Sequence, residues 1–258
     1  MKKVKITLVS TIVCINIITA ICLVSCQNNE SGNTFDNSTS SHDEVSSISY
    51  ELRNVSVDYT INEEVFSDTS HINSNVNIKY PQLIGDKRDY SEVNNFIKET
   101  IMEHLYDYGV DYSNLTITVD FKITFSNKRL ISIVFSGFGN VRTAAHPNNI
   151  FYSLNIDLEA CSKIKLQDIC SINSNLVKIY REKWAQQTDE VRAVILRDYN
   201  DDDLIKAFTQ ADNLGSSVYS YLTSNGVAFS LSVSHAIGDH IETEINYQEI
   251  KDNLKIKE

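Results

Sequence analysis

Two neighbouring stretches near the middle of the chain alternate apolar and polar residues, and this alternation constrains the fold more than any other feature. Leu115 to Phe125 has an apolar residue at every second position, and Leu130 to Phe138 follows as a more apolar segment. A period of two is typical of a β-strand with one buried face. Asn127-Lys128 lies between the two stretches and predicts a turn, so together they predict a long antiparallel hairpin.

The rest of the pattern extends this hairpin into a mixed structure. Further strands are predicted over Ile48–Ile61, Val76–Tyr80 (ending at Pro81), Ile150–Leu158, Val218–Leu222, Val227–Val233 and Ile241–Tyr247. Helices are predicted from the capping Ser91 to Gly109 and over Asn173–Gln187, Val191–Arg197, Asp202–Thr209 and Gln248–Lys255. Asn225-Gly226 predicts a two-residue turn between two of these strands. Antiparallel hairpins with helices set between them predict an α+β fold, with the helices packed on the sheets.

The N-terminal segment predicts export and lipid attachment. Met1–Lys5 is basic, Ile6–Val24 is mostly apolar, and the small Ser25 precedes Cys26, which is the layout of an export signal. We interpret Leu23-Val24-Ser25-Cys26 as a lipoprotein processing site, cleaved before Cys26, whose sulfur then carries acyl chains such as palmitate. An uncleaved transmembrane anchor is the alternative, because the apolar run is about long enough to span a bilayer. No stop-transfer charges follow the run, which favours cleavage.

This interpretation divides the chain into a signal peptide (1–25), a tether (26–49) and a domain (50–258). Two acyl chains on Cys26 would hold the protein stably on the extracytoplasmic face of a bacterial cell membrane. The tether is rich in Asn, Ser, Thr and acidic residues, and we expect it to be disordered because it has almost nothing to bury. The domain is long enough for one large core or for two lobes, at about 50–160 and 161–258.

The charge of the chain indicates which partners suit it. Removal of residues 1–25 takes three lysines away and leaves 20 basic against 34 acidic residues, a net charge of −14. Such a surface repels nucleic acid and anionic lipid head groups and attracts cationic partners. The alternative is that the acidic excess serves solubility alone.

Two cysteines remain once the signal peptide and the lipid-carrying Cys26 are set aside. Cys161 and Cys170 are nine positions apart. In an oxidising compartment a close pair predicts a disulfide rather than a metal site. The alternative is two separate buried thiols.

A histidine-rich stretch and one isolated histidine are the candidate functional residues. His235, Asp239, His240 and Glu242 fall within eight positions. Imidazole and carboxylate groups suit zinc, but this spacing matches no ligand motif, so we expect a hydrogen-bonded loop without a metal or other cofactor. His146 is either a buried, hydrogen-bonded residue or a ligand contact. The chain has no G-x-S-x-G nucleophile elbow, and nothing else in it predicts an enzyme.

Three stretches together resemble a known family. They are Tyr80-Pro81-Gln82-Leu83 leading into the Val93–Leu105 helix; Thr143–Pro147 with Tyr152–Leu158 and Ile164–Ile169; and Tyr221–Gly226 with Phe229–Leu231 and Ala236–Ile245. In this order they resemble the extracytoplasmic domain of anti-sigma-V factors of the RsiV type, a module also found with polysaccharide deacetylases of the PdaC type. The resemblance spans about Ser49–Glu258. It departs at Thr143-Ala144-Ala145-His146-Pro147, where the family has a glycine-rich loop around the histidine.

The resemblance implies a binding module rather than a catalyst. In the anti-sigma factors this module senses lysozyme, a basic protein that would suit an acidic surface. The chain shows neither the sigma-binding segment nor a deacetylase domain, so the resemblance predicts a lipid-anchored binding protein. Its expected partners are lysozyme or peptidoglycan, with His146, His235 and His240 as candidate ligand contacts. The alternative is a hydrolase acting on cell-wall glycan, with His146 or His235 at its centre.

Overall fold

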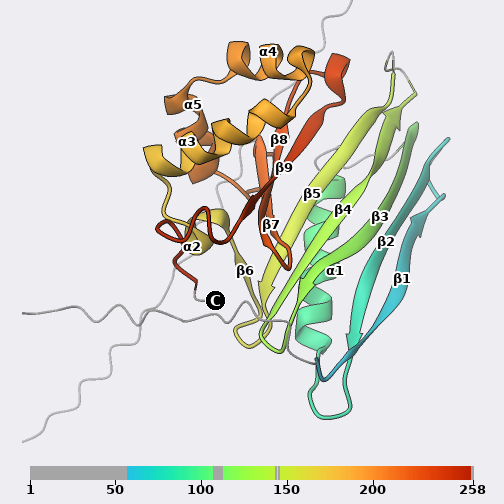
Figure 1. Cartoon of the computed structure of the whole chain (residues 1–258). Coiled ribbons are helices and arrows are strands. Elements are labelled where there is room, and N and C mark those ends of the chain that lie inside the picture. Colours follow the sequence, from blue (N-terminus) through green and yellow to red (C-terminus); the bar gives the residue numbers. More distant parts are fainter. Residues whose placement is uncertain (1–56, 107–112, 143, 145, 257–258) are drawn as a thin grey trace, which may run out of the picture. The chain divides into compact units, whose positions relative to one another are not determined.

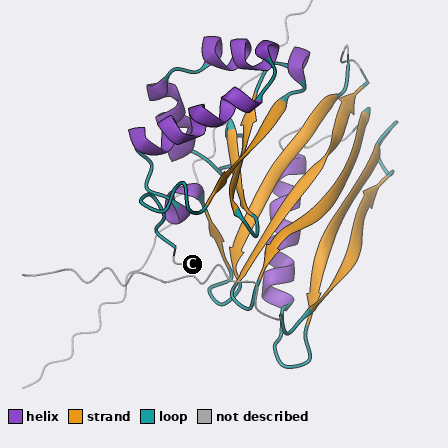
Figure 2. Ribbon diagram, viewed as in Figure 1, coloured by secondary structure: helices purple, strands orange, loops and turns teal. Residues whose placement is uncertain are grey.

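The computed structural model describes residues 57–106, 113–142, 144 and 146–256, and it confirms the α+β class (Figures 1 and 2). A six-stranded sheet has the order β1-β2-β3-β4-β5-β6, and a three-stranded sheet has the order β7-β8-β9. The strands are β1 Thr60–Asp68, β2 Asn75–Ile84, β3 Leu115–Ser126, β4 Leu130–Val141, β5 Asn148–Asp157, β6 Ser162–Ile164, β7 Val218–Leu222, β8 Gly226–Ser232 and β9 His240–Asn246. The helices are α1 Ser91–Tyr106, α2 Leu166–Ile169, α3 Ser174–Lys183, α4 Asp189–Asp198 and α5 Asp201–Thr209, with single 3-10 turns η1 Trp184–Gln186 and η2 His235–Ile237.

The first core lies between α1 and one face of the six-stranded sheet (Figure 1). The apolar stripe of α1 is buried there at Ile97, Ile101 and Leu105, as its three- and four-residue spacing predicts. Ile117 of β3 and Ile133 of β4 are buried in the same cluster. The predicted helix and the predicted hairpin of β3 and β4 are both confirmed, because β3 and β4 pair antiparallel along their whole length.

A β-bulge near the end of β3 changes which face its last apolar residue occupies. Ile123 pairs with Ile133, but Phe125 pairs with Ser132, so Thr124 is an extra residue in the ladder. Ile133 and Ser132 point to opposite faces, so Phe125 faces away from the α1 side and packs in the second core instead. The prediction that strict alternation keeps Phe125 on the same face as Ile123 was wrong for this reason.

Pro81 does not end the second strand, contrary to the prediction. β2 continues to Ile84 and pairs with β1 along its length, with Pro81 opposite Glu63. The parallel pairing of β2 with β3 covers only Asn75–Ile78, so β2 needs no ladder hydrogen bond from Pro81 on that side. The strand expected over Ile48–Ile61 lies mainly outside the described residues, and the strand that is described begins at Thr60.

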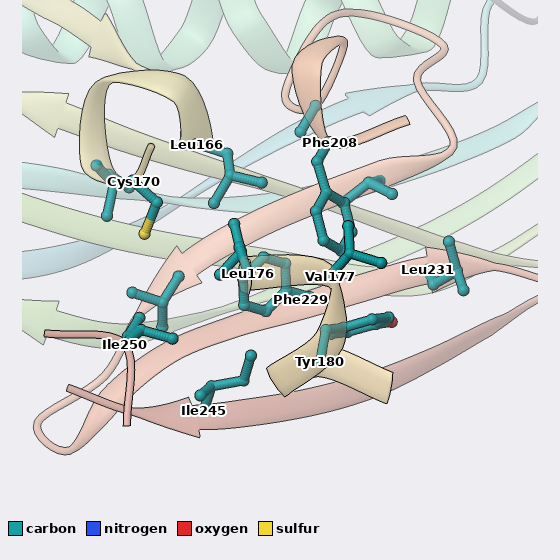
Figure 3. Close-up of a cluster of buried hydrophobic side chains, with 14 of the residues drawn as sticks. Leu166, Cys170, Leu176, Val177, Tyr180, Phe208, Phe229, Leu231, Ile245 and Ile250 are labelled. Atoms are coloured by element: carbon teal, nitrogen blue, oxygen red, sulfur yellow. The ribbon is translucent and has the colours of Figure 1, made fainter. Parts of the chain in front are cut away.

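The second core joins the helices α3 and α5 to one face of the three-stranded sheet (Figure 3). The ring of Tyr180 in α3 lies 5.1 Å from Phe208 of α5 and 5.3 Å from Phe229 of β8. Asn173 caps α3 by accepting the N–H of Leu176, which fits the predicted start of that helix. The helices predicted around α4 and α5 are likewise confirmed.

Two predictions in the C-terminal part were wrong. Residues 248–255 form turns instead of a helix, because Leu254 bridges to Cys170 and the side chain of Asn253 donates to the carbonyl of Ser171. The hairpin turn is also displaced by one residue. The N–H of Thr223 donates to the carbonyl of Gly226, so Ser224-Asn225 is the central pair.

Side chains of the large sheet bond the edge strand of the small one. The hydroxyl of Ser132 accepts the N–H of Leu222 at 3.0 Å. The hydroxyl of Ser153 and the amide of Asn155 both donate to the carbonyl of Ser220, at 2.6 and 2.9 Å. β7 is an edge strand, and these bonds satisfy backbone groups that no further strand pairs with. They also fix the small sheet against β4 and β5, which creates the groove described next.

Candidate functional site

Two adjoining cavities form one groove between the start of β5 and the outer face of β7 and β8. Their volumes are about 280 and 330 Å³, and they share Asn149, Phe151, Ser216 and Tyr219 in their linings. The first cavity reaches α1 and the second reaches the start of β9. We call these two cavities together the inter-sheet groove, and its size is within the usual range of roughly 300–1,000 Å³ for ligand sites.

His104 of α1 lines the first end of the inter-sheet groove. Its ring stacks on that of Tyr152, with ring centres 3.9 Å apart and planes at 12°. The ring of Phe135 also stacks on Tyr152, at 4.8 Å. Burial lowers the pKa of His104 to about 4, and the nearby Lys163 lowers it further, so the imidazole is neutral at pH 7. Within the described residues its ring nitrogens have no hydrogen-bond partner.

His240 lines the other end, at the first position of β9. Its ring lies 4.7 Å from that of Phe151. Burial lowers the pKa of His240, against the opposing effect of the carboxylates of Glu242 and Asp239. Its Nδ1 is buried and has no hydrogen-bond partner in the described part of the chain. Both ends of the groove therefore carry neutral imidazoles with unused hydrogen-bonding capacity.

Hydroxyl groups line the part of the groove that reaches β9. Ser217, Ser230 and Ser232 contribute to the second cavity, and in the described ranges their hydroxyls make no hydrogen bond. Among the described lining residues no Lys or Arg occurs, and Asp239 is the single carboxylate. That carboxylate already accepts the N–H of Asn149 at 2.8 Å. The groove thus offers uncharged donors and acceptors.

The predicted His146 and His235 meet at the surface beside the His240 end. Their rings stack at 3.8 Å and 4°, and both side chains are exposed. Nδ1 of His235 lies 2.9 Å from a carboxylate oxygen of Asp239, four residues later. The stretch from His235 to Asp239 is therefore a hydrogen-bonded loop, as predicted. His146 is exposed, so the interpretation of His146 as a buried, hydrogen-bonded residue was wrong.

Metal binding has no geometric support in this loop. No group of three or more His, Cys, Asp or Glu side chains within the described residues is arranged to hold a metal ion. The Asp239 carboxylate is used by His235 and by Asn149, both of which lower its pKa, although burial opposes them.

Two carboxylates on β9 face away from the second core. Glu242 and Glu244 alternate with inward-facing residues, so they share the outer face of the strand. The hydroxyl of Tyr221 donates to Glu242, and the hydroxyl of Thr223 donates to Glu244. Neither carboxylate pairs with Lys or Arg in the part of the chain that is described. We call Glu242 and Glu244 the β9 carboxylate pair.

The predicted disulfide is not present. Cys161 and Cys170 are free thiols, as the alternative interpretation expected, although only Cys170 is buried and Cys161 is half-buried. β6 and α2 separate them and lead them into different clusters, Cys161 beside the first core and Cys170 within the second. Burial raises the pKa of the Cys170 thiol to about 12.

Cys26, the predicted lipid site, lies outside the described residues, as do the predicted signal peptide and tether.

His104 is the groove residue that the sequence interpretation missed. It stands three residues after Ile101 and seven after Ile97, so it falls on the apolar stripe of α1. A histidine at such a position was a signal that it faces the sheet, although not that a cavity would lie beside it.

None of the helices in the described ranges is both long and apolar enough to cross a membrane.

Comparison with known proteins supports the fold. No protein-family model matches the sequence, and no curated protein matches it. Several solved structures resemble it, and two of them are DUF3298 family proteins. One is a member of the DUF3298 family from Bacteroides fragilis, with a TM-score of 0.52 and 16% identity over 76% of this chain and 93% of that one. The other is a DUF3298 family protein from Pseudomonas aeruginosa, with a TM-score of 0.44 and 15% identity over 76% and 92%. The chain therefore shares its fold with the Bacteroides fragilis member of the DUF3298 family.

Proposed function

We propose that this chain is a lipid-anchored binding protein on the extracytoplasmic face of a bacterial membrane, and that it binds a basic protein of the lysozyme kind. The single observation that carries the binding role is the β9 carboxylate pair. The hydroxyls of Tyr221 in β7 and of Thr223, directly after β7, hold Glu242 and Glu244 in place, and no Lys or Arg of the described chain neutralises them. Charges fixed in this way are available to a cationic partner without further ordering.

The surroundings of the pair suit a basic protein surface. The ring of Tyr221, which holds Glu242, lies 6.1 Å from that of Phe151, and the ring of His240 lies 4.7 Å from that of Phe151. Aromatic faces beside carboxylates attract Lys and Arg side chains through cation–π contacts as well as through charge. The net charge of −14 expected after processing adds long-range attraction. The resemblance to the lysozyme-sensing module agrees with this choice of partner.

A hydrolytic role receives less support. Nucleophilic hydrolysis needs a hydroxyl or thiol hydrogen-bonded to a general base. Within the described residues, His235 is bonded to Asp239 and stacked on His146, and neither imidazole bonds a hydroxyl nucleophile. Binding is therefore the function that we propose.

A titration of the purified full-length protein with lysozyme at two salt concentrations tests the proposal. We expect binding at about 0.01 M salt, where the Debye length is about 30 Å, and much weaker binding at about 1 M, where it is about 3 Å. The matched control is α-lactalbumin, which has the lysozyme fold but an acidic surface and should not bind. Absence of lysozyme binding at low salt would refute the proposed partner.

A further inference from the structure

The inter-sheet groove has a chemistry that the binding of a basic protein does not use. Apart from the Asp239 carboxylate, the polar groups of its described lining are neutral, and they include the imidazoles of His104 and His240 and the hydroxyl of Ser230. None of these groups has a hydrogen-bond partner in the described chain. A polar group withdrawn from bulk water without a partner costs about 1–3 kcal/mol, so a ligand that supplies partners is favoured.

The charge of the lining limits what this ligand can be. No Lys or Arg among the described lining residues offers a counter-charge to a phosphate or a carboxylate. A cation would depend on Asp239, whose carboxylate is already occupied by the N–H of Asn149 and by His235. An uncharged ligand fits the groove better than an ion of either sign.

The hydrogen-bonding groups of the lining indicate which class of uncharged ligand fits. A neutral imidazole has one donor and one acceptor nitrogen, and a serine hydroxyl both donates and accepts. A ligand that matches both roles at many positions carries several hydroxyl or amide groups. Tyr219 and Phe151 line both cavities and add apolar ring surface between the polar groups. A chain of sugar rings, with hydroxyls at the edges and C–H groups on the faces, has this combination.

We propose that the inter-sheet groove binds an uncharged saccharide, with His104 and His240 as hydrogen-bonding partners at its two ends. The proposal rests on the general role of the chain as a binding domain but not on the basic partner or on the β9 carboxylate pair. Two adjoining cavities of about 280 and 330 Å³ favour a ligand of more than one ring.

Calorimetric titration of the full-length protein with neutral and charged sugars tests this proposal. The probes are the N-acetylglucosamine trimer, maltotriose and, as a charged comparison, the galacturonic acid trimer. We expect a neutral trimer to bind and the anionic trimer to bind more weakly or not at all. His104→Phe keeps a ring on Tyr152 but removes both nitrogens, and His240→Phe does the same beside Phe151. Each should weaken binding of the neutral trimer by about 3- to 10-fold, the net value of one hydrogen bond.

His71→Phe is the matched control, because His71 lies between β1 and β2 and does not line the groove. It should leave saccharide affinity unchanged. Thermal unfolding, measured on every variant, shows whether each protein is folded. If neither neutral trimer binds, or if both groove variants keep wild-type affinity, the saccharide proposal is wrong whatever the lysozyme result. If a neutral trimer binds as expected and lysozyme does not, the basic partner is wrong and the groove proposal stands.

Discussion

Asp212 accepts both hydrogens that Ser220 offers, the backbone N–H at 2.6 Å and the hydroxyl at 2.7 Å. It also accepts the N–H of Leu166 at 2.7 Å, and its side chain is fully buried. The carboxyl thus ties the start of α2 to β7, the strand that forms one wall of the groove. Burial raises the pKa of Asp212 to about 6, although these hydrogen bonds and the positive charge of Lys163 oppose the shift.

The raised pKa of Asp212 predicts a specific dependence of stability on pH. The folded protein binds this proton more tightly than the unfolded chain, so the contribution of Asp212 to stability is largest below about pH 4 and is lost as pH rises to about 6. Two pKa units correspond to a loss of about 3 kcal/mol.

Urea unfolding of wild type and Asp212→Asn between about pH 4 and pH 7 measures this loss of stability. The difference between the two proteins should change by about that amount, whereas Asp202→Asn, an exposed change in α5, should parallel wild type. Parallel curves for Asp212→Asn and wild type would contradict this assignment.

Removal of the Ser132 hydroxyl should destabilise the junction of the two sheets. This hydroxyl accepts the N–H of Leu222 and donates to the side chain of Asn155 at 2.6 Å. Ser132→Ala leaves a buried N–H without a partner, which should lower the free energy of unfolding by about 1–3 kcal/mol. Ser136→Ala is the control, because Ser136 lies on the same face of β4 but is exposed. Equal stability of the two variants in urea titrations would show that the bond contributes nothing.

Gly226 is required by close packing between β8 and β9. A Cβ atom at this position would lie 2.0 Å from the carbonyl oxygen of Ile245. Gly226→Ala should therefore lower the free energy of unfolding by about 1–3 kcal/mol through overpacking. Gly215→Ala meets no atom within 4 Å and is strained only by its φ of +69°, so its cost should be nearer 1 kcal/mol. Thermal unfolding of both variants checks the order, and a more stable Gly226→Ala protein would contradict it.

Replacement of Cys26 should release the protein from the membrane. If two acyl chains on this sulfur are the anchor, Cys26→Ala leaves nothing to hold the exported chain. Fractionation of cells and labelling with a palmitate analogue measure the change. Cys22→Ala should keep both the label and the membrane association, since Cys22 precedes the proposed cleavage site. A Cys26→Ala protein that stays membrane-bound after export would favour an uncleaved helix.

Local periodicity predicted most of the fold. The stripe from Ile97 to Leu105 and the alternation from Leu115 to Val119 identified one helix and one sheet face, because both follow from local geometry. The failures occurred where distant pairing decides. Pro81 is tolerated in β2 because β3 pairs with β2 only as far as Ile78. The bulge at Thr124 places the side chain of Phe125 on the opposite face of the sheet. Neither event is visible in a local pattern.

The candidate site could be predicted only in part. Asp239 and His235 are four residues apart, and their contact followed from the loop between them. His104 comes from α1 and His240 from β9, and no local pattern relates two elements so far apart in the chain. The cysteine pair failed for a related reason. The separation of only nine positions suggested that Cys161 and Cys170 are in contact. The intervening β6 and α2 instead place the two thiols in separate hydrophobic clusters.

The role of the β9 carboxylate pair can be measured as the affinity for lysozyme of a protein that lacks both carboxylates. At low salt, Glu242→Gln/Glu244→Gln should bind lysozyme about tenfold more weakly than wild type, a loss of about 1.4 kcal/mol, and should show a shallower salt dependence. The control Glu190→Gln/Asp202→Asn removes the same charge from exposed positions on α4 and α5 and should change the affinity much less. Equal losses in the two double variants, or wild-type affinity without the β9 carboxylates, would contradict the account.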